Sequence, residues 1–218
     1  MGEKAKYFEE LMHEKDERKK NIIQAAKDLF NEVGIINTKM SKIAKKAKVG
    51  DVTVYRYFNT KMDLATAVAN SYWNETTLIF EEQYTPKIIT AENGLAKIRI
   101  FLEVFIMFYE NRKPFLKYMN DYDIYMKNNK VTDDSLLFDQ NIVDAKKAFI
   151  QILKEGQVDG SIKIDIEPNN QYSFVSEVMA GTTTKLALRH GYLLSESDFE
   201  PQDVIRKTID MYINYIKN

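Results

Sequence analysis

Residues 34–64 read GIINTKMSKIAKKAKVGDVTVYRYFNTKMDL, and this stretch decides the fold. Two short segments in it carry apolar residues three to four positions apart, the spacing of one face of a helix. The segment Lys48–Asp51 between them suits the tight turn of a helix-turn-helix. Thr38 stands where a hydroxyl can cap the first short helix. The apolar positions are Met40, Ile43, Ala44 and Ala47, then Val52, Val54, Tyr55 and Phe58, of which we expect Tyr55 and Phe58 in the hydrophobic core.

Positive charge is concentrated in the same stretch. From Thr38 to Lys61 there are seven basic residues and one acid, which leaves a net six positive charges, whereas the whole chain has 31 basic and 32 acidic residues. Such a patch indicates a polyanionic partner, because lysine and arginine displace counterions from phosphates. A solvated lysine-rich face gives the same charge pattern, so the helix spacing is what favours DNA. The basic residues are Lys39, Lys42, Lys45, Lys46, Lys48, Arg56 and Lys61.

An ordered set of residues in this region resembles the N-terminal domain of the TetR family of bacterial transcriptional regulators. Two departures from the family pattern stand at the turn: the family often has glycine where Lys48 and Val52 stand, and serine where Gly50 stands. Asp51 also puts an acid at the start of the recognition helix, so no base preference can be carried over. The matching residues are Ala25, Ala26, Phe30, Gly34, Thr38, Ile43, Ala44, Ala47, Val49, Thr53, Tyr55, Tyr57, Phe58, Lys61 and Leu64.

The resemblance implies an all-α protein with two domains. Residues 1–64 would form a three-helix helix-turn-helix DNA-binding domain, with residues 1–20 partly frayed, and residues 65–218 a larger helical domain for ligand binding and dimerisation. The implied function is a one-component regulator, a repressor that binds palindromic double-stranded operator DNA as a homodimer and is released by a largely apolar small molecule. The alternative is a helical protein-interaction module of the same fold that has lost sequence-specific DNA binding.

The DNA contacts can be assigned as hypotheses. Thr38, Tyr57 and Lys61 would hold the phosphate backbone. Thr53 and Arg56 would read base edges from the second hairpin helix, although Arg56 fits the solvent side equally well. Further contacts near the turn are Lys48, Gly50 and Asp51.

The remaining chain is predicted to be helical. A first helix begins at about residue 20 and ends at Gly34, and Thr60 with Asp63 forms a capping box for a helix that runs to about residue 84. The apolar run 98–109 should be a central pillar, because a helix that is apolar nearly all round needs neighbours on most faces. Isoleucines alternate in residues 158–168, which we interpret as an extended connector. Further helices are expected at about 114–128, 135–157, 169–190 and 201–216.

The second domain is rich in aromatic residues and methionine, which suit a cavity for a largely apolar small molecule. For any single residue, filling the core is the simpler explanation. The candidates for the effector pocket are Trp73, Phe101, Phe105, Phe108, Tyr118, Tyr122, Phe138 and Met179.

The last two helices carry apolar stripes that would be a liability on a monomer. We expect them to pair with their copies in a second chain as a four-helix interface. The residues assigned to this dimer interface are Phe174, Val178, Gly181, Ile205, Ile209, Tyr212 and Ile213.

Composition argues against other classes of protein. Zero cysteines exclude disulfides and thiolate chemistry, and the charged N-terminus has no apolar segment of a signal peptide. No long apolar run could span a membrane, so a cytoplasmic protein with no membrane partner is expected. His13 and His190 lie outside any nucleophile or metal motif and suit capping or surface positions. No P-loop, dinucleotide or hydrolase motif is present, so we predict no enzyme, no cofactor and no metal site.

Overall fold

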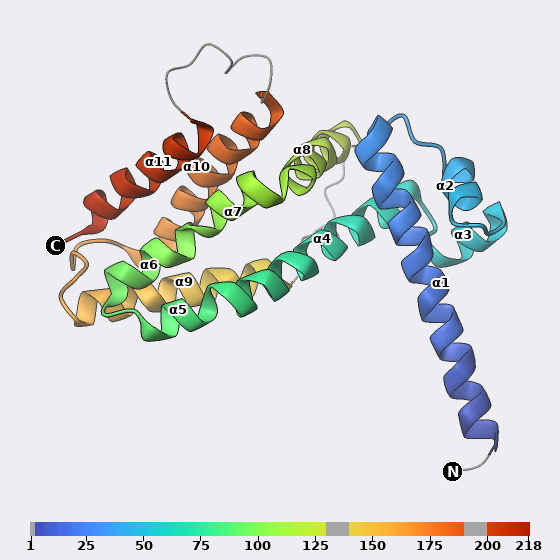
Figure 1. The fold of residues 1–218 in the computed structure, drawn as a ribbon, viewed down its shortest axis with the longest axis horizontal. Coiled ribbons are helices and arrows are strands. Elements are labelled where there is room, and N and C mark those ends of the chain that lie inside the picture. Colours follow the sequence, from blue (N-terminus) through green and yellow to red (C-terminus); the bar gives the residue numbers. More distant parts are fainter. Residues whose placement is uncertain (1–2, 130–139, 190–199) are drawn as a thin grey trace. The chain divides into compact units, whose positions relative to one another are not determined.

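The computed structural model describes residues 3–129, 140–189 and 200–218 (Figure 1). These residues are almost entirely helical and contain no strand beyond an isolated antiparallel bridge between Ile162 and Lys217. The all-α prediction is therefore confirmed. The chain divides into two compact units: unit 1 comprises residues 1–72 and 121–137, and unit 2 comprises residues 73–120 and 138–218. No described helix is both long and apolar enough to cross a membrane.

Unit 1 is built from the N-terminal helices. It contains α1 (Glu3–Val33), α2 (Met40–Lys46), α3 (Asp51–Tyr57), the first half of α4 (Lys61–Gln83) and the second half of α8 (Lys113–Asn128). The predicted fraying of residues 1–20 is wrong for the described part, because α1 is continuous from Glu3. Its first turns carry interleaved charges that can pair along the helix, as Lys20 does with Glu17 at 2.9 Å.

A small apolar core holds unit 1 together. Gly34, with φ 81°, ends α1 through a bond from its N–H to the carbonyl of Phe30 at 2.9 Å. The chain then turns back through buried Ile35, so that α2 packs against α1 and α3 against α2. The core residues are Ile22, Ala25, Ala26, Phe30, Ile35, Ile43, Ala44, Val54, Phe58, Leu64, Ala65, Val68, Ala69 and Tyr72.

Unit 2 contains the other described helices. The predicted pillar is two helices, α6 (Gly94–Leu102) and α7 (Val104–Asn111), that meet at Glu103, and the short α5 (Thr85–Thr90) precedes them. The helices α9 (Gln140–Val158), α10 (Pro168–Arg189) and α11 (Pro201–Ile216) follow, close to their predicted bounds; residues 135–139 and His190 lie outside the described residues.

Close helix contacts organise unit 2. α6 packs along α9, and a Cβ on Gly94 would lie 2.3 Å from the Cα of Gly156, so neither glycine can be replaced without moving a backbone. α10 packs against α7 and α9, and α11 against α6, α7 and α10. The connector after α9 buries Ile162 and Ile166 but exposes Ile164, which explains its alternation without a sheet.

Candidate nucleic-acid interface

The α2–α3 hairpin is closed by backbone hydrogen bonds at its turn. Lys48 has a left-handed backbone with φ 57°, its N–H bonds to the carbonyl of Lys45 at 3.2 Å, and the N–H of Val49 bonds to the carbonyl of Ala44 at 3.0 Å. These two bonds form the Schellman motif that ends many helices, usually with glycine at the left-handed position. A lysine there keeps the fold at a conformational cost.

The outer side of α3 is open. Val52 is 84% exposed and Tyr55 50% exposed, and Arg56 is exposed next to them. The prediction that Phe58 lies in the core is confirmed, whereas the same prediction for Tyr55 is wrong, because Val54 and Phe58 fill the inward face of this short helix. Arg56 lies 5.7 Å from the ring centre of Tyr57, within reach of a cation–π contact.

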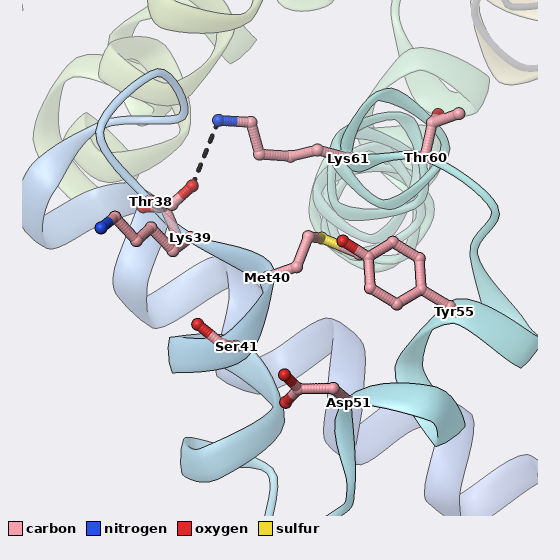
Figure 2. Close-up of a pocket in the computed structure, with 8 residues that line it drawn as sticks. All are labelled: Thr38, Lys39, Met40, Ser41, Asp51, Tyr55, Thr60 and Lys61. Atoms are coloured by element: carbon pink, nitrogen blue, oxygen red, sulfur yellow. Dashed lines mark hydrogen bonds between the residues drawn. The ribbon is translucent and has the colours of Figure 1, made fainter.

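A pocket of about 530 Å³ opens beside α3. It is formed by the loop before α2, the first turn of α2, the first turns of α3 and the start of α4, and Figure 2 shows side chains from all four segments around it. Hydroxyl groups and two lysines make the lining mostly polar, with Asp51 as its acid. The lining residues are Thr38, Lys39, Met40, Ser41, Asp51, Tyr55, Thr60 and Lys61.

The start of α4 is fixed by the predicted capping box. The Asp63 carboxylate accepts a bond from the N–H of Thr60 at 2.9 Å, and the Thr60 hydroxyl accepts one from the N–H of Asp63 at 3.1 Å. This reciprocal pair confirms that Thr60 caps the helix. It also holds both residues at the rim of the pocket.

The ammonium group of Lys61 is bound to the backbone of the α1–α2 loop. It donates to the carbonyls of Ile35 at 2.8 Å, Ile36 at 3.0 Å and Thr38 at 3.1 Å, the last drawn in Figure 2. Partial burial lowers the pKa of Lys61, against the opposing effect of the Asp121 charge. An ammonium has three donors, and here all three serve carbonyls. In this structure Lys61 holds the loop rather than offering a free donor to a phosphate.

Thr38 is directed inward. Its side chain is 2% exposed, and its hydroxyl donates to the carbonyl of Gly34 at 2.7 Å. The prediction that Thr38 caps α2 is wrong: Lys39 is the N-cap residue and makes no side-chain cap bond. The turn at Gly34 brings Thr38 back over the end of α1, which explains the difference.

The comparisons with known proteins agree with this geometry. Residues 22–68 match the family model described as bacterial regulatory proteins, tetR family. The N-terminal domain belongs to the TetR family. The match spans α1 from Ile22, the α2–α3 hairpin and the first turns of α4. A search of curated protein sequences found no match.

Solved structures of TetR-family regulators share the whole fold. One from Mesorhizobium loti is 17% identical with a TM-score of 0.68, covering 93% of this chain and 98% of that chain. One from Haloarcula marismortui is 16% identical with a TM-score of 0.68, covering 93% and 100%. FadR from Bacillus subtilis, solved in complex with stearoyl-CoA, is 19% identical with a TM-score of 0.55, covering 90% and 98%. At these identities the likeness establishes the fold.

The residues predicted to line an effector pocket are divided in this TetR-family fold. In unit 2, a series of edge-on ring contacts runs from Trp73 through Phe115 and Phe108 to Phe105, and a second series runs from Phe80 through Phe101 and Phe149 to Tyr172. Tyr118 and Met179 are buried in the same unit. Tyr122 lies in unit 1, where its hydroxyl bonds to Thr66 at 2.9 Å, and Phe138 lies outside the described residues.

The predicted dimer residues separate by helix. Phe174, Val178 and Gly181 of α10 are exposed. The four residues named on α11 are buried within unit 2, so we correct their assignment: an amphipathic stripe shows that a face is covered, and here the chain itself covers it. These four are Ile205, Ile209, Tyr212 and Ile213. The exposed apolar residues of α11 are Met211 and Tyr215.

Sequence reasoning missed several residues at the pocket. Lys39 and Ser41 stand at the start of the first hairpin helix, and Thr60 was recognised only as a cap. A basic and a hydroxyl residue beside a helix start was the signal that could have found them. The other predicted contacts lie along the turn and α3, where Lys48, Gly50 and Asp51 are exposed and Thr53 and Tyr57 are half-buried. Among the described residues, no three His, Cys, Asp or Glu side chains gather to hold a metal ion.

Proposed function

We propose that this protein is a one-component transcriptional repressor that binds palindromic operator DNA as a homodimer and is released by a small molecule. One observation carries the proposal: the outer side of α3, with Val52, Tyr55 and Arg56, is open beside a pocket lined by hydroxyls and lysines. A regulator of this kind acts in the cytoplasm, without cofactor or metal, and is not an enzyme.

In the proposed complex α3 enters the major groove. Thr53 and Arg56 read base edges, and the exposed Val52 contacts a thymine methyl group, since apolar side chains read that group. Tyr57 supports the guanidinium of Arg56 and contacts the adjacent backbone, with Lys48, Gly50 and Asp51 near the turn.

A backbone phosphate would sit in the pocket. Lys39 supplies the positive charge, and Ser41, Tyr55 and Thr60 supply hydroxyls, the groups that proteins commonly place on phosphate oxygens. We assign Thr38 and Lys61 a supporting role, because their donors hold the loop that carries Lys39.

The dimer would form through α10 and α11. These helices pack side by side and leave a shared apolar face that includes Phe174 on α10 and Met211 on α11. A face of this kind on a monomer supports pairing with a second copy. Its exposed members are Phe174, Val178, Gly181, Leu188, Met211 and Tyr215.

The effector would be largely apolar and uncharged. In the described part of unit 2 the buried polar residues are Thr76 and Thr183, and no charged side chain is buried. The two hydroxyls have no protein partner, which suits a ligand with one or two neutral hydrogen-bonding groups among aromatic rings. The fold neighbours were solved with ligands as different as stearoyl-CoA and choline, so the likeness to them does not choose the effector.

The test is selection of duplexes from a random-sequence pool by the purified protein. We expect enrichment of an inverted repeat whose half-sites are centred about 34 Å, one helical turn, or a multiple of it apart. The Arg56→Ala variant should lose selectivity at one position of each half-site. Selection without any enriched sequence would contradict the proposal and favour the interaction-module alternative.

A further inference from the structure

The first five turns of α1 form an exposed arm, defined here as residues 6–20. Every side chain in this arm is exposed, and burial in α1 begins at Ile22. Figure 1 shows the arm projecting past the α2–α3 hairpin of the same unit. The arm also precedes the region that matches the TetR family model, which starts at Ile22. The family domain therefore gives no account of it.

An apolar stripe continues from the core of unit 1 onto the arm. Eighteen residues are five full turns of a helix, so residues that far apart lie on the same line along its surface. Phe8 stands eighteen positions before Ala26 and Met12 eighteen before Phe30, both of which are buried. Yet Tyr7 and Phe8 are each 64% exposed, and Leu11 and Met12 are exposed as well.

The basic residues of the arm follow this stripe. Lys15, Arg18 and Lys19 stand seven, four and three positions before Ile22, which places them on its side of the helix. Glu14 lies at the boundary of that side. The other carboxylates fall on the opposite half with Lys6 and Lys20, of which Lys20 is paired with Glu17. The carboxylates on the opposite half are Glu9, Glu10, Asp16 and Glu17.

We propose that this basic and apolar face of the arm lies along the DNA that flanks the operator half-site; the inference rests on the proposed DNA binding. Lys15, Arg18 and Lys19 contact backbone phosphates. The apolar tip from Tyr7 to Met12 lies against the adjacent groove, where DNA-binding proteins place aromatic and aliphatic side chains.

Charge selects DNA over a second copy of the arm. Pairing two arms through this face would set three cations of one copy against those of the other, with no carboxylate between them except Glu14. A polyanion instead matches them, and the face is turned toward the side of α1 on which the hairpin packs. It is therefore continuous with the candidate interface on α3.

Two double variants of identical composition test the proposal. Lys15→Gln with Lys19→Gln removes two charges from the proposed face, and Lys6→Gln with Lys20→Gln removes two from the opposite face. Binding of the full-length proteins to a random-sequence duplex is measured by fluorescence anisotropy across a salt series. We expect the first variant to lower the slope of log Kd against log salt by roughly 2, since each phosphate contact contributes about 0.9. The second should match the parent.

A third variant, Leu11→Ser with Met12→Ser, separates the apolar contact from the ionic ones. It should weaken binding several-fold while leaving the salt slope of the parent unchanged. Circular dichroism of each variant controls for loss of helix in the exposed arm.

Equal salt slopes for the two lysine double variants, with a parent that binds DNA, would overturn the inference and leave the proposed function standing. Equal slopes together with a selective loss of binding to anionic phospholipid vesicles in the first variant would assign the face to a membrane surface instead. A parent with no salt-dependent DNA binding would overturn both.

Discussion

The carboxylate of Asp121 accepts a hydrogen bond from the backbone N–H of Ile35 at 2.7 Å, although the two residues are 86 positions apart. Asp121 lies on the second half of α8, within unit 1, and also touches the position where Gly34 would carry a side chain. On the other side of the loop, Lys61 of α4 holds the carbonyls of Ile35, Ile36 and Thr38. The loop that leads into the hairpin is thus fixed by its N–H from α8 and by its carbonyls from α4.

Removing the Asp121 carboxylate should destabilise unit 1. Asp121→Ala leaves the Ile35 N–H without its partner, and an unsatisfied buried donor costs about 1–3 kcal/mol. Asp121→Asn keeps an acceptor of the same shape and should lose less. Urea unfolding gives the free energies, and hydrogen exchange of the Ile35 amide reports the bond directly. Equal stability of Asp121→Ala and the parent would show that the bond contributes nothing.

Lys48 should become more stabilising when replaced by glycine. A left-handed backbone costs a residue with a Cβ roughly 1–2 kcal/mol, and the greater freedom of glycine in the unfolded chain returns roughly 0.5–1 kcal/mol of that. We expect Lys48→Gly to raise the free energy of unfolding by about 0.5–1 kcal/mol. Lys48→Ala removes the same charge but keeps the Cβ, so it should show no such gain. Thermal unfolding that ranks the alanine variant equal to or above the glycine variant would refute this explanation.

The face shared by α10 and α11 should govern the oligomeric state. Met211 is 73% exposed on this face, and Ile89 is 72% exposed on α5, outside it. Met211→Glu should convert a dimer to a monomer in sedimentation velocity, because it places a charge in an apolar interface. Ile89→Glu is the matched control and should leave the dimer intact. A dimer that survives Met211→Glu, or dissociates equally with Ile89→Glu, would place the interface elsewhere.

Asp159 should make the stability of unit 2 depend on acid. Its carboxylate accepts bonds from the N–H groups of Gly94 at 2.7 Å and Ser161 at 2.9 Å. Slight burial raises the pKa of this carboxyl, but the bonds from Ser161 and Gly94 outweigh it, and the pKa lies below its ordinary value.

The sign of the acid effect follows from that direction. A carboxylate with a lowered pKa stabilises the fold above its unfolded value of about 3.9, and this contribution is lost as the pH falls through the folded pKa. Asp159→Asn cannot titrate, so its urea midpoint should fall less than that of the parent when the pH is lowered below about 4. Identical pH profiles would contradict the role given to these bonds.

The helices and the hairpin could be predicted from the sequence because their signals are local. The periodic apolar residues around Ile43 and Val54 and the capping pair Thr60–Asp63 each act over a few positions. The roles of Thr38 and Lys61 could not, because they depend on the turn at Gly34 and on loop carbonyls more than twenty positions from Lys61. Long-range contacts leave no periodic trace in one sequence.

The stripes of the last two helices show a second limit. Phe174 and Ile209 both repeat at helical spacing, yet Phe174 is exposed and Ile209 is buried. Periodicity identifies a face that needs covering, but it does not say whether the same chain or a second copy covers it. For the same reason Tyr55 could not be distinguished from Phe58 by spacing alone.

The most direct test of the central claim is fluorescence anisotropy of the purified protein on DNA from upstream of its own gene, against a scrambled duplex, across a salt series. The proposed function predicts tight, sequence-selective binding that weakens steeply as salt rises. Weak and equal binding to both duplexes, together with no duplex enriched from the random pool, would contradict it.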